Sequence, residues 1–236
     1  MKIRISVLIF CLAALNSYSQ ERKYSFDAFA AKIENNNLVV VDTAGKTVFR
    51  KVFNNPREQS ADLDGDGINE LLVTDLNSKG DKNFYTLYIF NTVDSFYVAD
   101  SIPSGLMEPY QTVSEDTEGI IIITGNTNFD SLNTNEGEAY VPIKCWKYED
   151  AKVHLINDKV YDIFISENDT LTDILDSYLE SNPNNCNSIE EVKAVIASVY
   201  ANYMNAGEKI LAYQFLKKYY PCSDLETFKQ KLNELL

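Results

Sequence analysis

Histidine is nearly absent from this chain of 236 residues, since His154 is its only one. A metal site built from several histidines is therefore excluded, and little room remains for acid–base catalysis by histidine. The four cysteines form no C-x-x-C pair, so neither a zinc knuckle nor a thioredoxin-type redox site is indicated. The sequence also has no glycine-rich phosphate-binding loop and no serine in a nucleophile motif.

Basic residues are also scarce. The chain has 21 lysines and arginines against 35 aspartates and glutamates, which gives a formal net charge of −14. Such an acidic protein is not expected to bind nucleic acid or an anionic membrane. Hydrophobic residues make up 45% of the sequence, which is enough to form a buried core. The length allows one large domain or two small ones.

Residues 1–19 have the features of a secretory signal peptide. Two basic residues precede an apolar run from Ile5 to Leu15, which is too short to span a bilayer comfortably. Small residues in the last positions of this segment predict cleavage between Ser19 and Gln20. No later stretch is long and apolar enough for a membrane helix. We therefore expect a periplasmic or secreted protein that does not span the membrane after cleavage.

The next part of the chain, roughly residues 24 to 165, has the short apolar and alternating runs that are typical of β-strands. The runs form three groups, each with a continuous apolar strand followed by a strand that carries aromatic side chains. Strands are expected at 37–42, 47–53, 70–75, 84–90, 95–100, 119–125, 139–148 and 152–156. Repeats of this size are typical of β-propeller blades, and an ordinary antiparallel meander is the alternative.

Beyond residue 168 the hydrophobic period becomes that of a helix. Thr170 is expected to cap the first helix, and Ser188 and Ser223 each begin a capping-box sequence for a later one. The later helices are expected over 188–205, 208–219 and from 223 onward. The fold prediction is therefore a β-rich antiparallel domain with partial propeller-like blades over residues 20–166, followed by a small α-helical domain over 167–236.

Three cysteines remain once the signal peptide is removed. Cys186 comes just before one expected helix and Cys222 just after the next, so a helical hairpin brings both to its open end. We predict a disulfide between them, which the chain-entropy relation values at about 3–4 kcal/mol. Cys145 is then a free thiol, expected to be buried in a strand beside Trp146. Cys11 lacks the small preceding residue that lipoprotein processing requires.

The sharpest chemical signal is the acidic stretch from Asp62 to Glu70, which reads DLDGDGINE. Its acidic side chains converge on one point only where the backbone curls tightly, and its two glycines permit such a curl. Several oxygen donors around a small concavity suit a hard cation, and Ca²⁺ tolerates irregular geometry better than Mg²⁺. The expected Ca²⁺ ligands are Asp62, Asp64, Asp66, the carbonyl oxygen of Ile68, and Glu70. An acidic turn without a metal is the alternative.

An EF-hand would require flanking helices and a bidentate glutamate at position 12 of the loop, which is Val73 here. The acidic stretch instead leads directly into an apolar strand. The sequence from Asp62 to Val73 resembles the FG-GAP, or VCBS, repeat of integrin-like β-propellers, in which the acidic residues hold Ca²⁺ in a loop between strands of a blade. The resemblance implies Ca²⁺ bound by the same five residues in a structural role. The motif occurs once in this chain, whereas the family usually repeats it.

Together these features predict an exported, non-enzymatic calcium-binding protein that acts as an interaction module for a protein or glycan partner. Two alternatives remain open. One is a periplasmic inhibitor of a peptidoglycan hydrolase, a class that this chain resembles in compartment, in the size of its β part and in its single acidic loop. The other is an enzyme that hydrolyses a glycan or peptide with a pair of carboxylates.

Overall fold

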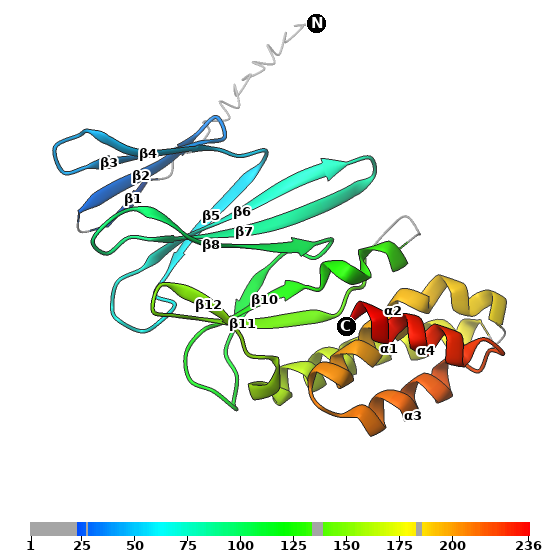
Figure 1. Cartoon of the computed structure of the whole chain (residues 1–236). Coiled ribbons are helices and arrows are strands. Elements are labelled where there is room, and N and C mark those ends of the chain that lie inside the picture. Colours follow the sequence, from blue (N-terminus) through cyan, green and yellow to red (C-terminus); the bar gives the residue numbers. More distant parts are fainter. Residues whose placement is uncertain (1–22, 27, 134–138, 183–185) are drawn as a thin grey trace, which may run out of the picture.

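The computed structural model of the protein describes residues 23–26, 28–133, 139–182 and 186–236, apart from the side chains of 187 and 188. The expected signal peptide and its cleavage between Ser19 and Gln20 lie outside these residues. In the described part of the chain, three four-stranded antiparallel sheets are followed by four helices (Figure 1). The β-rich part followed by a helical part is thereby confirmed. None of the described helices has the length and apolarity needed to cross a membrane.

Each sheet is a meander in which consecutive strands pair. The first sheet contains β1 (Lys23–Ser25), β2 (Phe29–Glu34), β3 (Asn37–Asp42) and β4 (Thr47–Val52). The second contains β5 (Pro56–Ala61), β6 (Glu70–Lys79), β7 (Lys82–Asn91) and β8 (Tyr97–Gly105). The third contains β9 (Tyr110–Thr112), β10 (Ile121–Gly125), β11 (Ile143–Glu149) and β12 (Lys152–Leu155).

All eight strands expected from the sequence are present, and β1, β2, β5 and β9 are additional. β5 was missed because it is polar and begins with Pro56. It lies at the edge of the second sheet, where a strand tolerates a proline. β9 has only three residues and forms the edge of the third sheet. Edge strands bury fewer side chains, so their sequences carry a weaker hydrophobic pattern.

The first and second sheets pack together through an aromatic core. Phe90 of β7 and Phe96 stack with their ring centroids 5.3 Å apart, and Phe49 of β4 contacts both rings. From β6, Leu71 and Val73 point into the same core. Rings of this size exclude much apolar surface from water, which makes this cluster a main stabilising contact between the two sheets.

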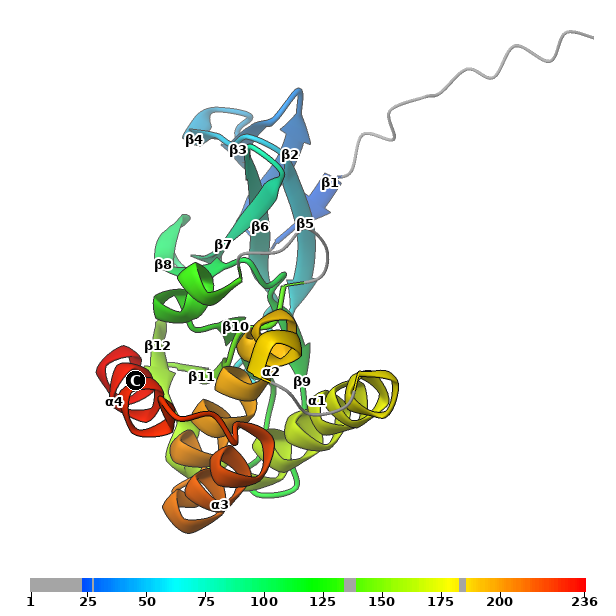
Figure 2. The same ribbon diagram turned by 90° about the vertical axis from the view of Figure 1, so that its right-hand side faces the viewer.

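The third sheet lies between the second sheet and the helices (Figures 1 and 2). Ile122 of β10 packs with Leu72 of β6 on one face, whereas Ile123 packs with Phe164 on the other. Both faces of β10 are therefore covered, and this explains its uninterrupted apolar sequence. Cys145 is a buried free thiol on β11, as expected.

The helical part consists of α1 (Tyr161–Ser181), α2 (Cys186–Asn205), α3 (Lys209–Tyr219) and α4 (Leu225–Leu235). Two short 3₁₀ helices, η1 (Thr127–Leu132) and η2 (Asn157–Lys159), lie in the connections of the third sheet. The break predicted between the second and third helices is confirmed, because Gly207 separates α2 from α3 with a φ of 81°. Only glycine adopts such a backbone conformation without strain.

The predicted start of the first helix at Thr170 is wrong. α1 begins at Tyr161, and the Thr170 hydroxyl donates a hydrogen bond to the carbonyl oxygen of Ser166 inside the helix. The first turns of α1 pack on the third sheet through Phe164, whereas its later turns pack on α2 through Leu175. The buried face runs at helical spacing from Phe164 through Asn168 to Leu175, and the polar Asn168 interrupts its hydrophobic pattern, so the pattern is recognisable only after residue 168. The boundary expected after residue 166 falls inside α1.

The two predicted capping boxes also differ from the structure. α4 is preceded by Asp224 rather than Ser223, and no side chain caps its first turn. The Asp224 carboxylate instead accepts a hydrogen bond from the Tyr220 hydroxyl at 3.1 Å. Ser188 lies inside the first turn of α2, and its side chain is outside the described part of the structure.

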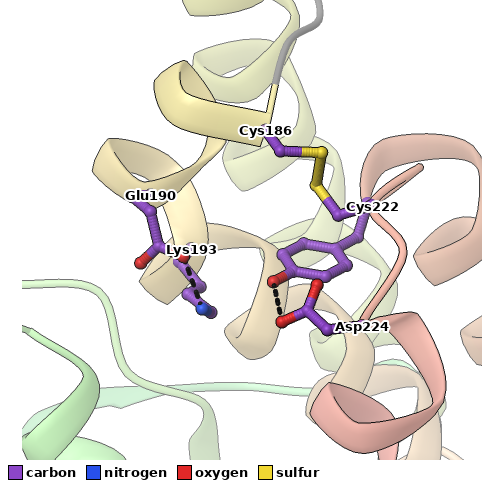
Figure 3. A network of polar contacts seen from close by, with 6 residues as sticks. Cys186, Glu190, Lys193, Cys222 and Asp224 are labelled. Carbon is purple, nitrogen blue, oxygen red and sulfur yellow. Dashed lines mark hydrogen bonds and ion pairs between the residues drawn. A yellow bond between two sulfur atoms is a disulfide. The ribbon is translucent and has the colours of Figure 1, made fainter.

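The predicted disulfide joins Cys186 at the start of α2 to Cys222 in the segment after α3 (Figure 3). Next to it, Lys193 forms an ion pair with Glu190 at 2.7 Å. The Lys193 ammonium also lies 5.5 Å from the centre of the Tyr220 ring. The disulfide and these polar contacts hold the α3–α4 connection against α2.

Candidate metal centre

The acidic loop of residues 62–69 connects β5 to β6, so the paired strands fix both of its ends. The pairing of these strands closes with Ala61 opposite Glu70. Within the loop, Gly65 and Gly67 have φ values of 79° and 85°. A residue with a Cβ is strained at such angles, and the two glycines therefore allow the tight curl that the sequence predicted.

The carboxylates of the loop hold its backbone in this curl. Asp62 accepts hydrogen bonds from the backbone N–H groups of Gly65 at 2.8 Å and Gly67 at 3.0 Å. Asp66 accepts one from the N–H of Ile68 at 2.7 Å. In these contacts, backbone N–H groups of the loop point toward the acidic side chains. The carbonyl oxygens of the loop remain as further candidate ligands.

Glu70 ties the loop to the protein core. Its side chain is only 1% exposed, and its carboxylate accepts a hydrogen bond from the N–H of Leu63 at 3.0 Å. Leu63 is itself 1% exposed and packs with Leu72 and Ile122 in the core between the second and third sheets. The position of Glu70 is therefore coupled to the packing of two sheets.

Three of the five predicted ligands come together. Asp62, Asp64 and Glu70 each place one carboxylate oxygen within 4.8 Å of the others, which is close enough for one ion to contact all three. Asp66 does not belong to this group, and its carboxylate accepts a hydrogen bond from the N–H of Ile68. Ile68, the fifth predicted ligand, is half-buried and donates its N–H to Asp66.

The electrostatics of the group favour a bound cation. Burial above all, and to a smaller extent the charges of Asp64 and Asp66, raises the pKa of Glu70 to about 7 against the opposing hydrogen bond from Leu63. Desolvation, together with the charges of Asp66 and Asp62, also raises the pKa of Asp64. Three carboxylates held this close destabilise one another unless a proton or a cation compensates their charge.

Two residues that support the loop were not recognised in the sequence. In the sequence, Leu63 only separates two acidic residues, yet in the structure its side chain packs in the core and holds the loop there. Thr92, which follows β7, donates a hydrogen bond from its hydroxyl to the carbonyl oxygen of Asn69 at 2.8 Å. No sequence signal marks Thr92, because the contact joins residues that only the folded second sheet brings together.

No protein-family model, curated protein or solved structure matches this chain. Its function is therefore argued from the chemistry of the site.

Proposed function

We propose that this chain is an exported, non-enzymatic protein that binds one Ca²⁺ in the loop of residues 62–70. The observation that supports the proposal best is the convergence of the Asp62, Asp64 and Glu70 carboxylates. Asp66 and the carbonyl oxygen of Ile68 remain the expected additional ligands from the exposed side of the loop. An all-oxygen donor set with several carboxylates is typical of Ca²⁺ sites.

The proposed role of the ion is structural. Glu70 opens β6, and Leu63 packs into the core between the second and third sheets. An ion bound to Glu70 would therefore hold the β5–β6 connection and the contact between these sheets in one arrangement. This role agrees with the resemblance of the stretch from Asp62 to Val73 to the FG-GAP, or VCBS, repeat.

We further propose that the three sheets are blades of a partial β-propeller. Each sheet is a meander of four antiparallel strands in sequence order, which is the strand arrangement of a propeller blade. A rigid set of sheets outside the cytoplasm offers an interaction surface for a protein or glycan partner. The expected location is the periplasm or the extracellular space, and the disulfide is compatible with such an oxidising compartment.

The test is thermal unfolding of the oxidised mature protein in Ca²⁺ and in chelator. An ion that binds only the folded state stabilises it by about 2.7 kcal/mol at a hundredfold excess over Kd. We expect Ca²⁺ to raise the melting temperature of the wild type and to have no effect on Asp64→Asn. Asp42→Asn is the matched control, because Asp42 also holds a turn, through the N–H groups of Ala44 and Lys46, outside the loop.

The control variant should melt at a lower temperature and still respond to Ca²⁺. A wild type that shows no shift at millimolar Ca²⁺, or an Asp64→Asn variant that responds like the wild type, would overturn the proposal.

A further inference from the structure

A second polar site lies in a groove between β8 and the third sheet, on residues other than the acidic loop. The groove has a volume of about 270 Å³. One wall is the segment 100–103 of β8, and the other is formed by side chains of β11 and β12, with Thr127 at the start of η1 also lining it. Its polar groups include the Asp100 carboxylate, the Lys144 ammonium group and the Thr127 hydroxyl.

Lys144 of β11 is the unusual member of the groove. Strand alternation places Lys144 and Trp146 on the face toward the second sheet, whereas Cys145 faces the helices. The Lys144 side chain is half-buried, and this burial lowers its pKa. Among the described residues, no ion pair, hydrogen bond or aromatic ring compensates its charge.

Other partly buried lysines of the chain are compensated. Lys147, two positions short of the end of β11, pairs with Glu149 at 2.7 Å, and Lys193 pairs with Glu190 at the same distance. A desolvated ammonium group without a partner is costly, and an anionic group of a ligand would compensate it. Lys144 therefore indicates where the negative charge of a ligand would bind.

Trp146 supplies an apolar surface beside this ammonium group. Its indole N–H donates a hydrogen bond to the Thr124 hydroxyl at 2.8 Å, which fixes the orientation of the ring. The indole is half-buried and lines the groove. A fixed aromatic ring next to a few polar groups is typical of small-molecule sites, and its flat face suits the apolar face of a pyranose ring.

The opposite wall offers groups that bind hydroxyls. Asp100 of β8 is held by a hydrogen bond from the N–H of Ser101 at 2.7 Å, and its carboxylate is an acceptor for ligand hydroxyls. The Thr127 hydroxyl can both donate and accept, whereas the side chain of Ser101 lies on the other face of β8, because Ser101 pairs with Tyr88, which packs toward the first sheet. A ligand that satisfies this wall carries several hydroxyl groups in addition to one negative charge.

We propose that this groove binds an anionic saccharide, a pyranose ring that carries a carboxylate. Its carboxylate pairs with Lys144, its apolar face packs on Trp146, and its hydroxyls bind Asp100. The inference rests on the proposed role as an interaction module, for which it names the partner class, and it does not depend on the calcium loop.

The chain itself provides the reporter for a test, because Trp146 is its only tryptophan. We would titrate the oxidised mature protein with trigalacturonate and with the neutral galactotriose and follow tryptophan fluorescence. Triglutamate is the control for an anion without a sugar ring. Lys144→Met is the test variant, and Lys147→Met is its matched control because Lys147 lies on the same strand and faces the other side.

We expect trigalacturonate to change the fluorescence saturably and to bind at least about tenfold more tightly than galactotriose. Lys144→Met should lose this preference and melt no lower than the wild type, because the substitution removes a desolvated charge, whereas Lys147→Met should bind as the wild type does. Equal binding of both sugars, binding of triglutamate as tight as that of trigalacturonate, or unchanged binding by Lys144→Met would overturn the proposal. So would the absence of any response at millimolar sugar. The calcium response of the melting temperature is measured separately, so failure of either proposal is recognised independently.

Discussion

The backbone N–H of Leu63 donates a hydrogen bond to the buried carboxylate of Glu70 at 3.0 Å. This contact joins the start of the acidic loop to its end. Because Leu63 also packs in the core between two sheets, the charge state of Glu70 is coupled to the stability of the β-rich part. Any ligand or proton that binds Glu70 therefore acts on more than the loop itself.

The first prediction concerns the pH dependence of stability without Ca²⁺. The pKa of Glu70 is raised from 4.5 to about 7 in the folded protein, so the folded state holds a proton that the unfolded state has lost. The contribution of Glu70 to the free energy of unfolding should accordingly be largest at or below pH 4.5. It should decrease as the pH rises to about 7. The loss attributable to Glu70 is at most about 3 kcal/mol. Urea unfolding in chelator across this range measures it.

Glu70→Gln should remove most of this slope, the decrease of the free energy of unfolding with rising pH. Glutamine keeps an acceptor for the N–H of Leu63 and does not ionise. Glu118→Gln is the control, because Glu118 is exposed, and it should retain the slope. A slope that persists unchanged in Glu70→Gln would show that another group dominates. With saturating Ca²⁺ the wild type should lose stability toward low pH instead, because protons then compete with the ion.

The sequence predicted local features well and long-range ones poorly. The spacing of acids and glycines predicted the curled loop, and the apolar runs predicted the central strands, because both depend on neighbouring residues. Asp66 was expected among the converging carboxylates, but it lies outside the group, and its carboxylate accepts a hydrogen bond from the N–H of Ile68 instead. The start of α1 was misplaced because its buried face includes Asn168, which interrupts the hydrophobic pattern between Phe164 and Leu171. A polar residue that is buried in the fold cannot be distinguished in the sequence from an exposed one.

The second prediction concerns Gly105, at the end of β8. Its φ is 59°, and a Cβ at this position would lie 2.4 Å from a carboxylate oxygen of Asp130. Asp130 would have to move and would lose its hydrogen bond from the N–H of Leu106. We expect Gly105→Ala to lower the free energy of unfolding by about 3 kcal/mol, of which about 1 kcal/mol comes from the backbone angle.

Gly80→Ala separates these two contributions. Gly80 has a φ of 67°, and nothing lies within 4 Å of the position of its added Cβ. This variant should lose only the cost of the backbone angle, about 1 kcal/mol in urea unfolding. Equal losses in the two variants would show that Asp130 moves aside at no cost.

The third prediction concerns the connection between the first and second sheets. Asp75 of β6 is 8% exposed, and its carboxylate accepts hydrogen bonds from the N–H groups of Asn54 at 2.8 Å and Asn55 at 3.0 Å. Asp75→Ala leaves both donors without this acceptor, and we expect a loss of about 2–3 kcal/mol. Asp75→Asn keeps one acceptor oxygen and should lose clearly less. If both variants lose the same stability in urea unfolding, the hydrogen bonds are not the cause.

The fourth prediction concerns the disulfide between Cys186 and Cys222. The two cysteines are 36 residues apart in sequence, and the chain-entropy relation gives a stabilisation of about 4 kcal/mol for a loop of this size. Reduction should therefore lower the melting temperature followed by far-ultraviolet circular dichroism, and Cys186→Ser with Cys222→Ser should reproduce the reduced protein. The effect should be specific to this pair because Cys145 is buried on β11 and free. Reductant should accordingly leave the melting temperature of the double variant unchanged. A further decrease of the melting temperature on adding reductant to that variant would mean that Cys145 takes part in another bond. An unchanged melting temperature of the reduced wild type would mean that packing alone holds the α3–α4 connection against α2.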